Sequence, residues 1–210
     1  MSEIITFNTE TGTTNALPKD PWDHLPPDEW VQKQVEWGIT SISGTGLVEP
    51  IKKLQGDLVG AEIGVCLGVT TELFAQQIPN LKKLYAIDSY PTFTDWNGVR
   101  VTRERQDGMK AHAANRLAPY KDKIELVYID SEAFAHTLAD ESLDFIFIDG
   151  DHSYEGALRD FRNFYPKIKK GGIFAGHDIV IPTVQKALIE FFGHLNVERV
   201  SHEAWYIIKE

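Results

Sequence analysis

The chain has 210 residues, a length that suits one domain with some additional segments and that buries roughly 70% of the surface of the unfolded chain. Its net charge of -10, from 21 basic and 31 acidic residues, disfavours nucleic-acid and membrane partners, which carry negative charge themselves. A single cysteine, Cys66, excludes an intrachain disulfide. Because there is no long apolar run and no signal-peptide pattern, we expect a soluble, cytoplasmic protein.

The N-terminal part of the chain differs in pattern from the rest. Residues 1–20 are polar and aperiodic, which predicts a tail or an arm laid on another surface. An acidic pair then opens a run with apolar residues near helical spacing, and Gly38 closes it, which predicts one short helix. We therefore assign residues 1–57 to an N-terminal tail and helical cap segment, and residues 58–210 to the main domain.

In the main domain, short apolar runs alternate with longer segments of helical periodicity, as in a parallel sheet with crossover helices. The predicted strands are 59–65, 83–87, 124–129, 143–148 and 172–175, and the predicted helices are 69–77, a segment within 101–117, 131–138, 154–165 and 183–192. The last two apolar runs, 197–200 and 204–208, are too close for a crossover and predict an antiparallel hairpin at the sheet edge. The expected fold class is α/β, a Rossmann-like, doubly wound and mostly parallel sheet.

Polar groups follow the first three predicted strands, at the edge where an open parallel sheet binds ligands. After the first strand, Gly64 and Gly68 let the backbone turn sharply and approach a ligand. Asp88 ends the second strand and is placed to accept hydrogen bonds from a ribose diol. Asp130 and Ser131 end the third, where an adenine would lie. The sequence therefore indicates a nucleotide-like site, although Asp88 or Asp130 could instead cap a helix.

Glu62 precedes the first glycine and argues against a dinucleotide, because a carboxylate there would repel a pyrophosphate and the G-x-G-x-x-G pattern is absent. It suits a cationic ligand end, such as an amino group or a sulfonium. At this point the chain resembles the class I S-adenosylmethionine-dependent methyltransferases, whose first motif is an acid, one residue and then spaced glycines; Cys66 stands where a glycine is common. The resemblance implies S-adenosyl-L-methionine as cofactor, bound by Glu62, Gly64, Gly68, Asp88, Ser89, Asp130, Ser131 and Asp149.

A second polar group follows the fourth and fifth predicted strands. The fourth strand runs into Asp149, Asp151 and His152, and the fifth runs into His177 and Asp178. Because these strands are predicted neighbours, the side chains can converge on one cleft. Carboxylates with imidazoles suit a divalent cation such as Mg²⁺ or Mn²⁺, and histidine suits general-base chemistry near neutral pH.

These two segments resemble the macrocin-type and cephalosporin-pathway O-methyltransferases and, more distantly, the catechol and caffeoyl-coenzyme A enzymes. The resemblance implies a metal site formed by Asp149, His177 and Asp178, with a His-Asp pair where those relatives have Asp-Asn or Glu-Asp. It places His152 at the position of the catalytic base, beside Asp149. The implied reaction is methylation of a hydroxyl on a small sugar or diol-like molecule, and a homo-oligomer is left open.

Other interpretations stay open at this point. A metal-dependent phosphoesterase would use the G-D-H and G-H-D fragments, but it needs an early strand-end D-x-H that this chain lacks. A cofactor-binding protein without catalysis would keep Gly64, Gly68 and Asp88 but make Asp149 and His152 dispensable. At single residues, Asp151 could cap the helix that begins near Ser153, His177 could be satisfied by backbone groups, and His152 could be a surface residue.

The substrate wall is expected in two aromatic segments. One contains Trp22 and Trp30, and the other is the loop 89–96. Loops and edge segments carry specificity on a fixed scaffold. Trp30 and Trp37 could equally serve as packing residues.

Overall fold

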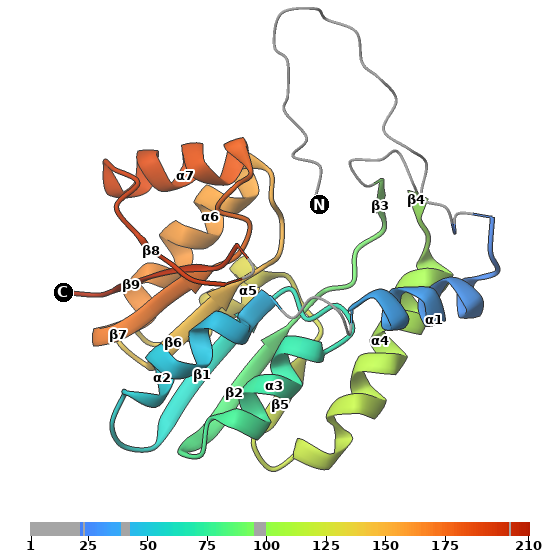
Figure 1. Ribbon diagram of the computed structural model, residues 1–210, viewed down its shortest axis with the longest axis horizontal. Helices are drawn as coiled ribbons and strands as arrows, with labels where there is room; N and C mark the ends of the chain where they lie inside the picture. The colour runs from blue at the N-terminus through green and yellow to red at the C-terminus, as the bar shows by residue number, and fades with distance from the viewer. Residues whose placement is uncertain (1–21, 23, 39–42, 95–99, 202) are drawn as a thin grey trace, which may run out of the picture.

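The computed structural model describes residues 22, 24–38, 43–94, 100–201 and 203–210, and one seven-stranded sheet organises them (Figure 1). The strands lie in the order β5-β2-β1-β6-β7-β9-β8. Their bounds are β1 Leu58–Ile63, β2 Leu81–Ile87, β5 Ile124–Val127, β6 Leu143–Ile148, β7 Ile168–Gly176, β8 Glu198–Arg199 and β9 Trp205–Ile208. Neighbours from β5 to β7 are parallel, while β9 is antiparallel to both β7 and β8. The predicted fold class and the antiparallel hairpin are confirmed.

The direction of winding reverses between β1 and β6, which are neighbours in the sheet although β2 and β5 lie between them in the sequence.

 Successive strands move outward from β1 to β2 and β5 on one side, and from β6 to β7 on the other. Ligands of such sheets bind beyond the carboxyl ends of the strands at this switch point. The two polar groups that the sequence indicates therefore flank one place.

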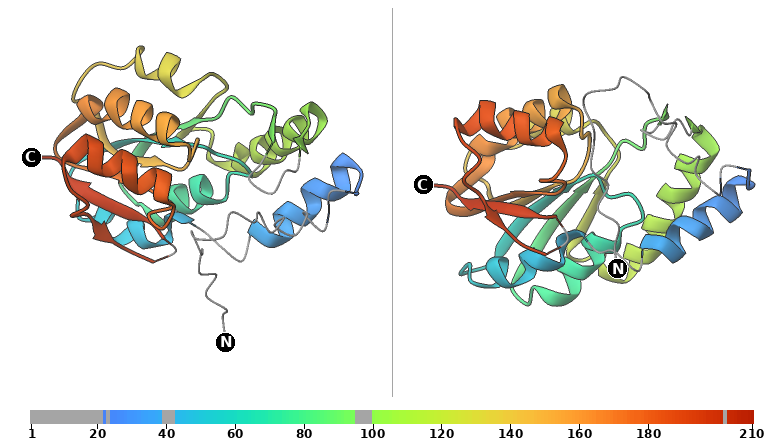
Figure 2. Two further views of the ribbon diagram at one scale, coloured as in Figure 1. Left: turned by 90° about the horizontal axis from the view of Figure 1, so that it is seen from above. Right: turned by 45° about the horizontal axis from the view of Figure 1, so that its top comes forward.

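Helices cover both faces of the sheet (Figures 1 and 2). One face carries α5 (Ser131–Ala135), α6 (Tyr154–Phe164) and α7 (Pro182–Phe192), and the other carries α2 (Val48–Lys52), α3 (Val69–Gln77) and α4 (Arg103–Leu117). Each layer buries its own apolar cluster, around Phe161 and Phe174 on the first face and around Phe74 and Phe145 on the second. Within the described ranges, no helix has the length and apolar character needed to cross a bilayer.

The helix α6 shows how the sequence sets these elements. Ser153 caps its first turn, because the serine hydroxyl accepts a hydrogen bond from the Gly156 N–H at 3.1 Å. Its buried residues Ala157, Leu158 and Phe161 recur at helical spacing and face the sheet. Pro166 follows in a short 3-10 turn, η3 (Tyr165–Lys167), which leads into β7.

The predicted N-terminal helix is α1 (Pro27–Gly38), which packs against α4. Trp30 is only 5% exposed, and the Arg105 guanidinium lies 4.8 Å from the centre of its ring. Val31 approaches so closely that a Cβ on Gly108 would lie 2.9 Å from it. The packing alternative therefore holds for Trp30. Residues 1–20 and part of the loop 89–96 lie outside the described residues.

Several elements differ from the sequence-based prediction. β7 begins at Ile168 instead of residue 172, and Gly171 and Gly172 exchange backbone hydrogen bonds with Lys209. α5 is shorter than predicted, since the Thr137 hydroxyl bonds the Phe134 carbonyl beyond its last turn. The additional short elements are η1 (Ser43–Leu47), β3 (Phe93–Thr94), β4 (Arg100–Val101) and η2 (Ala118–Tyr120).

Candidate active site

The turn after β1 lies at the switch point and joins the two halves of the carboxyl edge. Gly64 has φ of +88°, and a Cβ there would lie 2.1 Å from the Asp149 carbonyl oxygen at the end of β6. Gly68, with φ of +75°, precedes the first turn of α3 and faces Leu117. The left-handed backbone and the close approach of neighbouring atoms both explain why glycine stands at these two positions. Contact of Gly64 and Gly68 with a cofactor stays a prediction.

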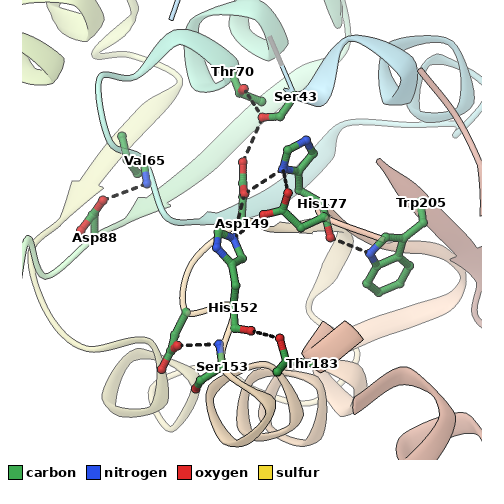
Figure 3. Close-up of polar contacts among 12 residues, drawn as sticks. Ser43, Val65, Thr70, Asp88, Asp149, His152, Ser153, His177, Thr183 and Trp205 are labelled. Carbon is green, nitrogen blue, oxygen red and sulfur yellow. Dashed lines mark hydrogen bonds and ion pairs between the residues drawn. The ribbon is translucent and has the colours of Figure 1, made fainter. Parts of the chain in front are cut away.

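Asp88, at the end of β2, holds this turn by hydrogen bonds. Its Oδ2 accepts a hydrogen bond from the backbone N–H group of Val65 at 3.0 Å (Figure 3). The same oxygen accepts one from the Cys66 N–H at 2.9 Å, and Oδ1 accepts one from the Tyr90 N–H at 2.7 Å. Burial raises the pKa of Asp88, and the three N–H groups act against that rise. The helix-cap alternative does not apply to Asp88, which instead joins two strand-end loops.

The Tyr90 side chain adds a second connection between the same loops. Its buried hydroxyl donates a hydrogen bond to the Cys66 carbonyl at 2.8 Å. Cys66 and Tyr90 both adopt left-handed backbone conformations, with φ of 51° and 49°. Side chains other than glycine rarely take this conformation, and where they do the surrounding contacts hold them there. Sequence reasoning missed Tyr90 as a contact of the glycine turn.

The three remaining polar residues of this half lie in different environments. Asp130 caps α5, accepting the Glu132 N–H at 2.9 Å, as the cap alternative expects. Ser131 is buried and donates a hydrogen bond to Asp160 at 2.7 Å. Ser89 is exposed. Adenine and ribose contacts by these residues stay predictions.

Glu62 lies inside the protein, on β1. Its carboxyl group accepts a hydrogen bond from the Thr71 hydroxyl of α3 at 2.6 Å. Burial, with a smaller contribution from the nearby carboxylates of Asp149 and Asp88, raises the pKa of Glu62 to about 8. Glu62 therefore lies beneath the site and interacts electrostatically with the carboxylates of Asp149 and Asp88.

Two carboxylates and two imidazoles meet beyond β6 and β7 (Figure 3). The His152 Nε2 lies 3.3 Å from Asp149 Oδ1 and 2.9 Å from Asp178 Oδ2. The His177 Nδ1 lies 3.3 Å from Asp149 Oδ1 and 3.3 Å from Asp178 Oδ1. Each imidazole thus contacts both carboxylates. Four of the five side chains that the sequence predicted to converge therefore meet in one place, without Asp151, and we call these four the reacting cluster.

Mutual contact shifts the pKa values within the reacting cluster. Burial works against protonated imidazoles, but the two carboxylates outweigh it and raise the pKa of both His152 and His177 to about 10. Burial alone would raise the pKa of the carboxyl groups, yet the imidazoles hold that of Asp149 below its usual value and that of Asp178 well below. The described arrangement is therefore two imidazolium ions against two carboxylates.

The reacting cluster also has the donor atoms of a metal site. Donor atoms of Asp149, His152 and Asp178 lie within 4.8 Å of one another, as do those of His177, Asp178 and Glu203. Both histidines are thus candidate ligands, whereas the sequence-based interpretation reserved His152 for the base. Glu203, in the turn before β9, was not anticipated, because only the folded hairpin brings it to the end of β7.

Neighbouring elements hold the loops of the reacting cluster in place. The Thr183 hydroxyl of α7 donates to the His152 carbonyl at 2.6 Å, and the Trp205 indole N–H of β9 donates to the His177 carbonyl at 3.0 Å. Asp151 accepts the Ser153 N–H at 2.9 Å and so belongs to the start of α6 rather than to the cluster. Asp178 has a left-handed backbone, with φ of 57°.

Comparison with known proteins supports this view of the fold. A structure from Corynebacterium glutamicum superposes with a TM-score of 0.60 at 14% identity, covering 85% of this chain and 88% of that one. An S-adenosylmethionine-dependent O-methyltransferase from Thermotoga maritima gives 0.56 at 14%, covering 85% and 70%. An rRNA methylase from Streptococcus thermophilus gives 0.52 at 14%, covering 78% and 94%.

Sequence comparison identifies the family. No protein with a curated description matches the chain. The family model of a methyltransferase domain matches residues 61–179, more than half of the 210 residues, from β1 to the turn after β7. This range includes the glycine turn, Asp88 and the whole reacting cluster. The chain therefore belongs to the methyltransferase domain family.

Proposed function

We propose that this methyltransferase methylates a hydroxyl oxygen of a small molecule, with a divalent cation such as Mg²⁺ or Mn²⁺ at the reacting cluster. The observation that carries the proposal is the meeting of Asp149, His152, His177 and Asp178 beyond two neighbouring strands, beside the switch point. Such a cluster suits oxygen chemistry, because a hydroxyl must lose its proton to become a strong nucleophile.

The cofactor half fits S-adenosyl-L-methionine by its chemistry. The molecule supplies a methyl group on a positively charged sulfur, and it carries an ammonium group and a ribose diol. Asp88 and Asp149 offer carboxylates on either side of the glycine turn. The Gly64 turn keeps the ends of β1 and β6 close, so that a cofactor bound along it would meet the reacting cluster. Exposed Tyr128 and Ile129 offer an apolar surface after β5.

The reacting cluster fits a divalent cation in both donor type and charge. Carboxylate oxygens and imidazole nitrogens are ligands that Mn²⁺ accepts, with carboxylates alone preferred by Mg²⁺. The two imidazolium protons that balance Asp149 and Asp178 carry the same charge as one divalent cation. Asp149, Asp178 and His177 would hold the ion, with His152 as the further ligand or the base. A bound divalent ion lowers the pKa of a coordinated hydroxyl.

In the described arrangement the base role of His152 falls to its second ring nitrogen. The His152 Nε2 faces both Asp149 and Asp178. In the neutral imidazole with its hydrogen on Nε2, the lone pair that can accept a substrate proton lies on Nδ1. The side chain is 41% exposed, which leaves it accessible to a substrate.

The charge of the chain favours a small acceptor over RNA. Its net charge of -10 and the carboxylates at the strand ends oppose a phosphate backbone. The rRNA methylase among the similar structures shares the fold at low identity, which says nothing of the substrate of this chain.

The test is methyl transfer from labelled S-adenosyl-L-methionine to two kinds of acceptor. One is a panel of catechols, vicinal diols and sugars, and the other is ribosomal RNA, each with Mn²⁺ or with excess chelator. An O-methylated small molecule that forms only with metal supports the proposal. Labelled RNA would overturn the substrate class, and full activity in chelator would overturn the metal.

Titration with S-adenosylhomocysteine separates catalysis from binding. Wild type and Asp178→Asn should both bind it, but only wild type should yield product. Binding by wild type with no product from any acceptor would favour a cofactor-binding protein without catalysis.

A further inference from the structure

The short helix η1 reaches the reacting cluster from outside the region that the family model matches. The Ser43 hydroxyl donates a hydrogen bond to Asp149 Oδ2 at 2.9 Å (Figure 3). Both imidazoles contact the other oxygen, Oδ1. The two oxygens of Asp149 thus have different partners, a hydroxyl on one side and His152 and His177 on the other. Contacts on both oxygens fix the orientation of the Asp149 carboxylate plane.

The backbone of η1 is fixed by close packing on two sides. A Cβ on Gly44 would lie 2.3 Å from the Thr70 side chain, and a Cβ on Gly46 would lie 2.7 Å from that of Val200. The turn therefore lies tightly between α3 and the chain that follows β8. Leu47 at its end is fully buried. Ser43 is thus presented to Asp149 by a rigid segment.

A second hydroxyl holds Ser43 itself. The Thr70 Oγ1, on the first turn of α3, lies 3.1 Å from the Ser43 Oγ. Thr70 is buried, so this hydroxyl has little access to water. The chain of contacts runs from α3 through Ser43 to Asp149 and links the helix after the glycine turn to the reacting cluster.

We propose that Ser43 is a positioning residue, which fixes the Asp149 carboxylate so that Oδ1 faces both imidazoles. The inference rests on the proposed function in assigning Asp149 to a metal-holding cluster. It also moves the start of the functional unit from residue 58 to residue 43. Ser43 needs no contact with substrate in this role, because it acts through Asp149.

The first test needs neither metal nor acceptor. Long-range ¹H–¹⁵N spectra at one fixed pH report the imidazole nitrogens of all seven histidines. In Ser43→Ala the signals of His152 and His177 should move, and those of the others should stay. Ser43→Thr, which keeps a hydroxyl, should restore them. Ser142→Ala is the matched control, because its hydroxyl bonds the Ala139 carbonyl at 2.7 Å before β6. Unmoved signals in a folded Ser43→Ala would overturn the proposal.

The second test measures Mn²⁺ binding by electron paramagnetic resonance. Ser43→Ala should bind Mn²⁺ about 10-fold more weakly, as expected when a partner of a ligand is lost, with S-adenosylhomocysteine affinity unchanged. Equal Mn²⁺ affinity in the variant and wild type would overturn the role of Ser43. If wild type binds no Mn²⁺, the metal part of the proposed function fails, while the imidazole spectra still decide on Ser43. Should Ser43→Ala not fold, Thr70→Val removes the anchor of Ser43, and unmoved His152 and His177 signals there would equally contradict the proposal.

Discussion

The two halves of the carboxyl edge hold their carboxylates in different ways. In the cofactor half, Asp88 is held by three backbone N–H groups. In the reacting half, Asp149 and Asp178 are held by the imidazoles of His152 and His177. Backbone donors neither titrate nor leave, whereas imidazolium protons can be exchanged for another cation. The contacts that hold Asp88 therefore do not depend on protonation. The net charge of the reacting cluster, in contrast, can change when its imidazoles lose protons.

The largest effect should come from removing an imidazole in the reacting half. His152→Ala should lower the rate of methyl transfer by roughly 10² to 10⁴, the usual contribution of a positioned acid or base. Its affinity for S-adenosylhomocysteine should stay near wild type, because Asp88 and the glycine turn are untouched. The measurement is the initial rate with the acceptor found in the panel above. His136→Ala, at the exposed residue that follows α5, is the control and should keep the rate.

A wild-type rate in His152→Ala would mean that the two halves do not differ in chemistry as proposed. His177 would then be the next residue to test.

The contact between the halves can be broken at Gly64. Gly64→Ala should destabilise the fold by about 3 kcal/mol, because a Cβ would overlap the Asp149 carbonyl and the backbone is left-handed. Gly56→Ala has a similar φ of +83° but no atom within 4 Å, so it should cost only about 1 kcal/mol. Urea unfolding of both variants isolates the contact from the backbone strain. Equal losses would show that the ends of β1 and β6 are not in such close contact.

Beneath both halves, Glu62 should make stability depend on pH. The folded-state pKa of about 8 exceeds the ordinary value of 4.5, so the folded protein binds more protons between these values and loses stability as pH rises through them. The Glu62→Gln variant has no ionisable group at this position, so its stability should not fall in this way as pH rises. The variant should gain about 2 kcal/mol relative to wild type between pH 5 and pH 6.5 in urea unfolding. A difference that does not change with pH would contradict the raised pKa.

The smallest effect is expected at Asp88 in the cofactor half. Asp88→Asn keeps one acceptor oxygen but loses the charge, so S-adenosylhomocysteine should bind about 10-fold more weakly, or about 1.4 kcal/mol. Isothermal titration gives the affinity, and circular dichroism checks the fold. Asp57→Asn, an exposed carboxylate beside Lys82, is the control. Unchanged affinity in a folded Asp88→Asn would remove Asp88 from the cofactor site.

The sheet and the reacting cluster could be predicted from sequence for the same reason. Strands buried on both faces read as apolar runs, and the polar residues directly after them must lie at the carboxyl edge. Asp149, His152, His177 and Asp178 follow two such runs and do converge. This reasoning needs only the order of elements, which periodicity shows.

What could not be predicted depends on contacts between distant segments. Ser43 reaches Asp149 because Gly44 lets η1 lie against Thr70, and nothing near residue 43 in sequence indicates that neighbour. Trp30 looked available for a substrate, but Arg105 covers its ring. The strand predicted to begin at residue 172 begins at Ile168, and Gly171 and Gly172 pair with the distant Lys209.

The insertion of β9 between β7 and β8 has a consequence for how the protein is made. Trp205 is fully buried against Gly176 and holds the His177 carbonyl, so the loop that carries His177 gains this support only from residues late in the chain. During synthesis, the edge of β7 that pairs with β9 stays unpaired until residues 205–208 have left the ribosome. An open strand edge is a template for wrong pairing. A nascent chain that stalls before Trp205 should therefore be a target for chaperones, and the His177 loop should settle only after Trp205 has been made.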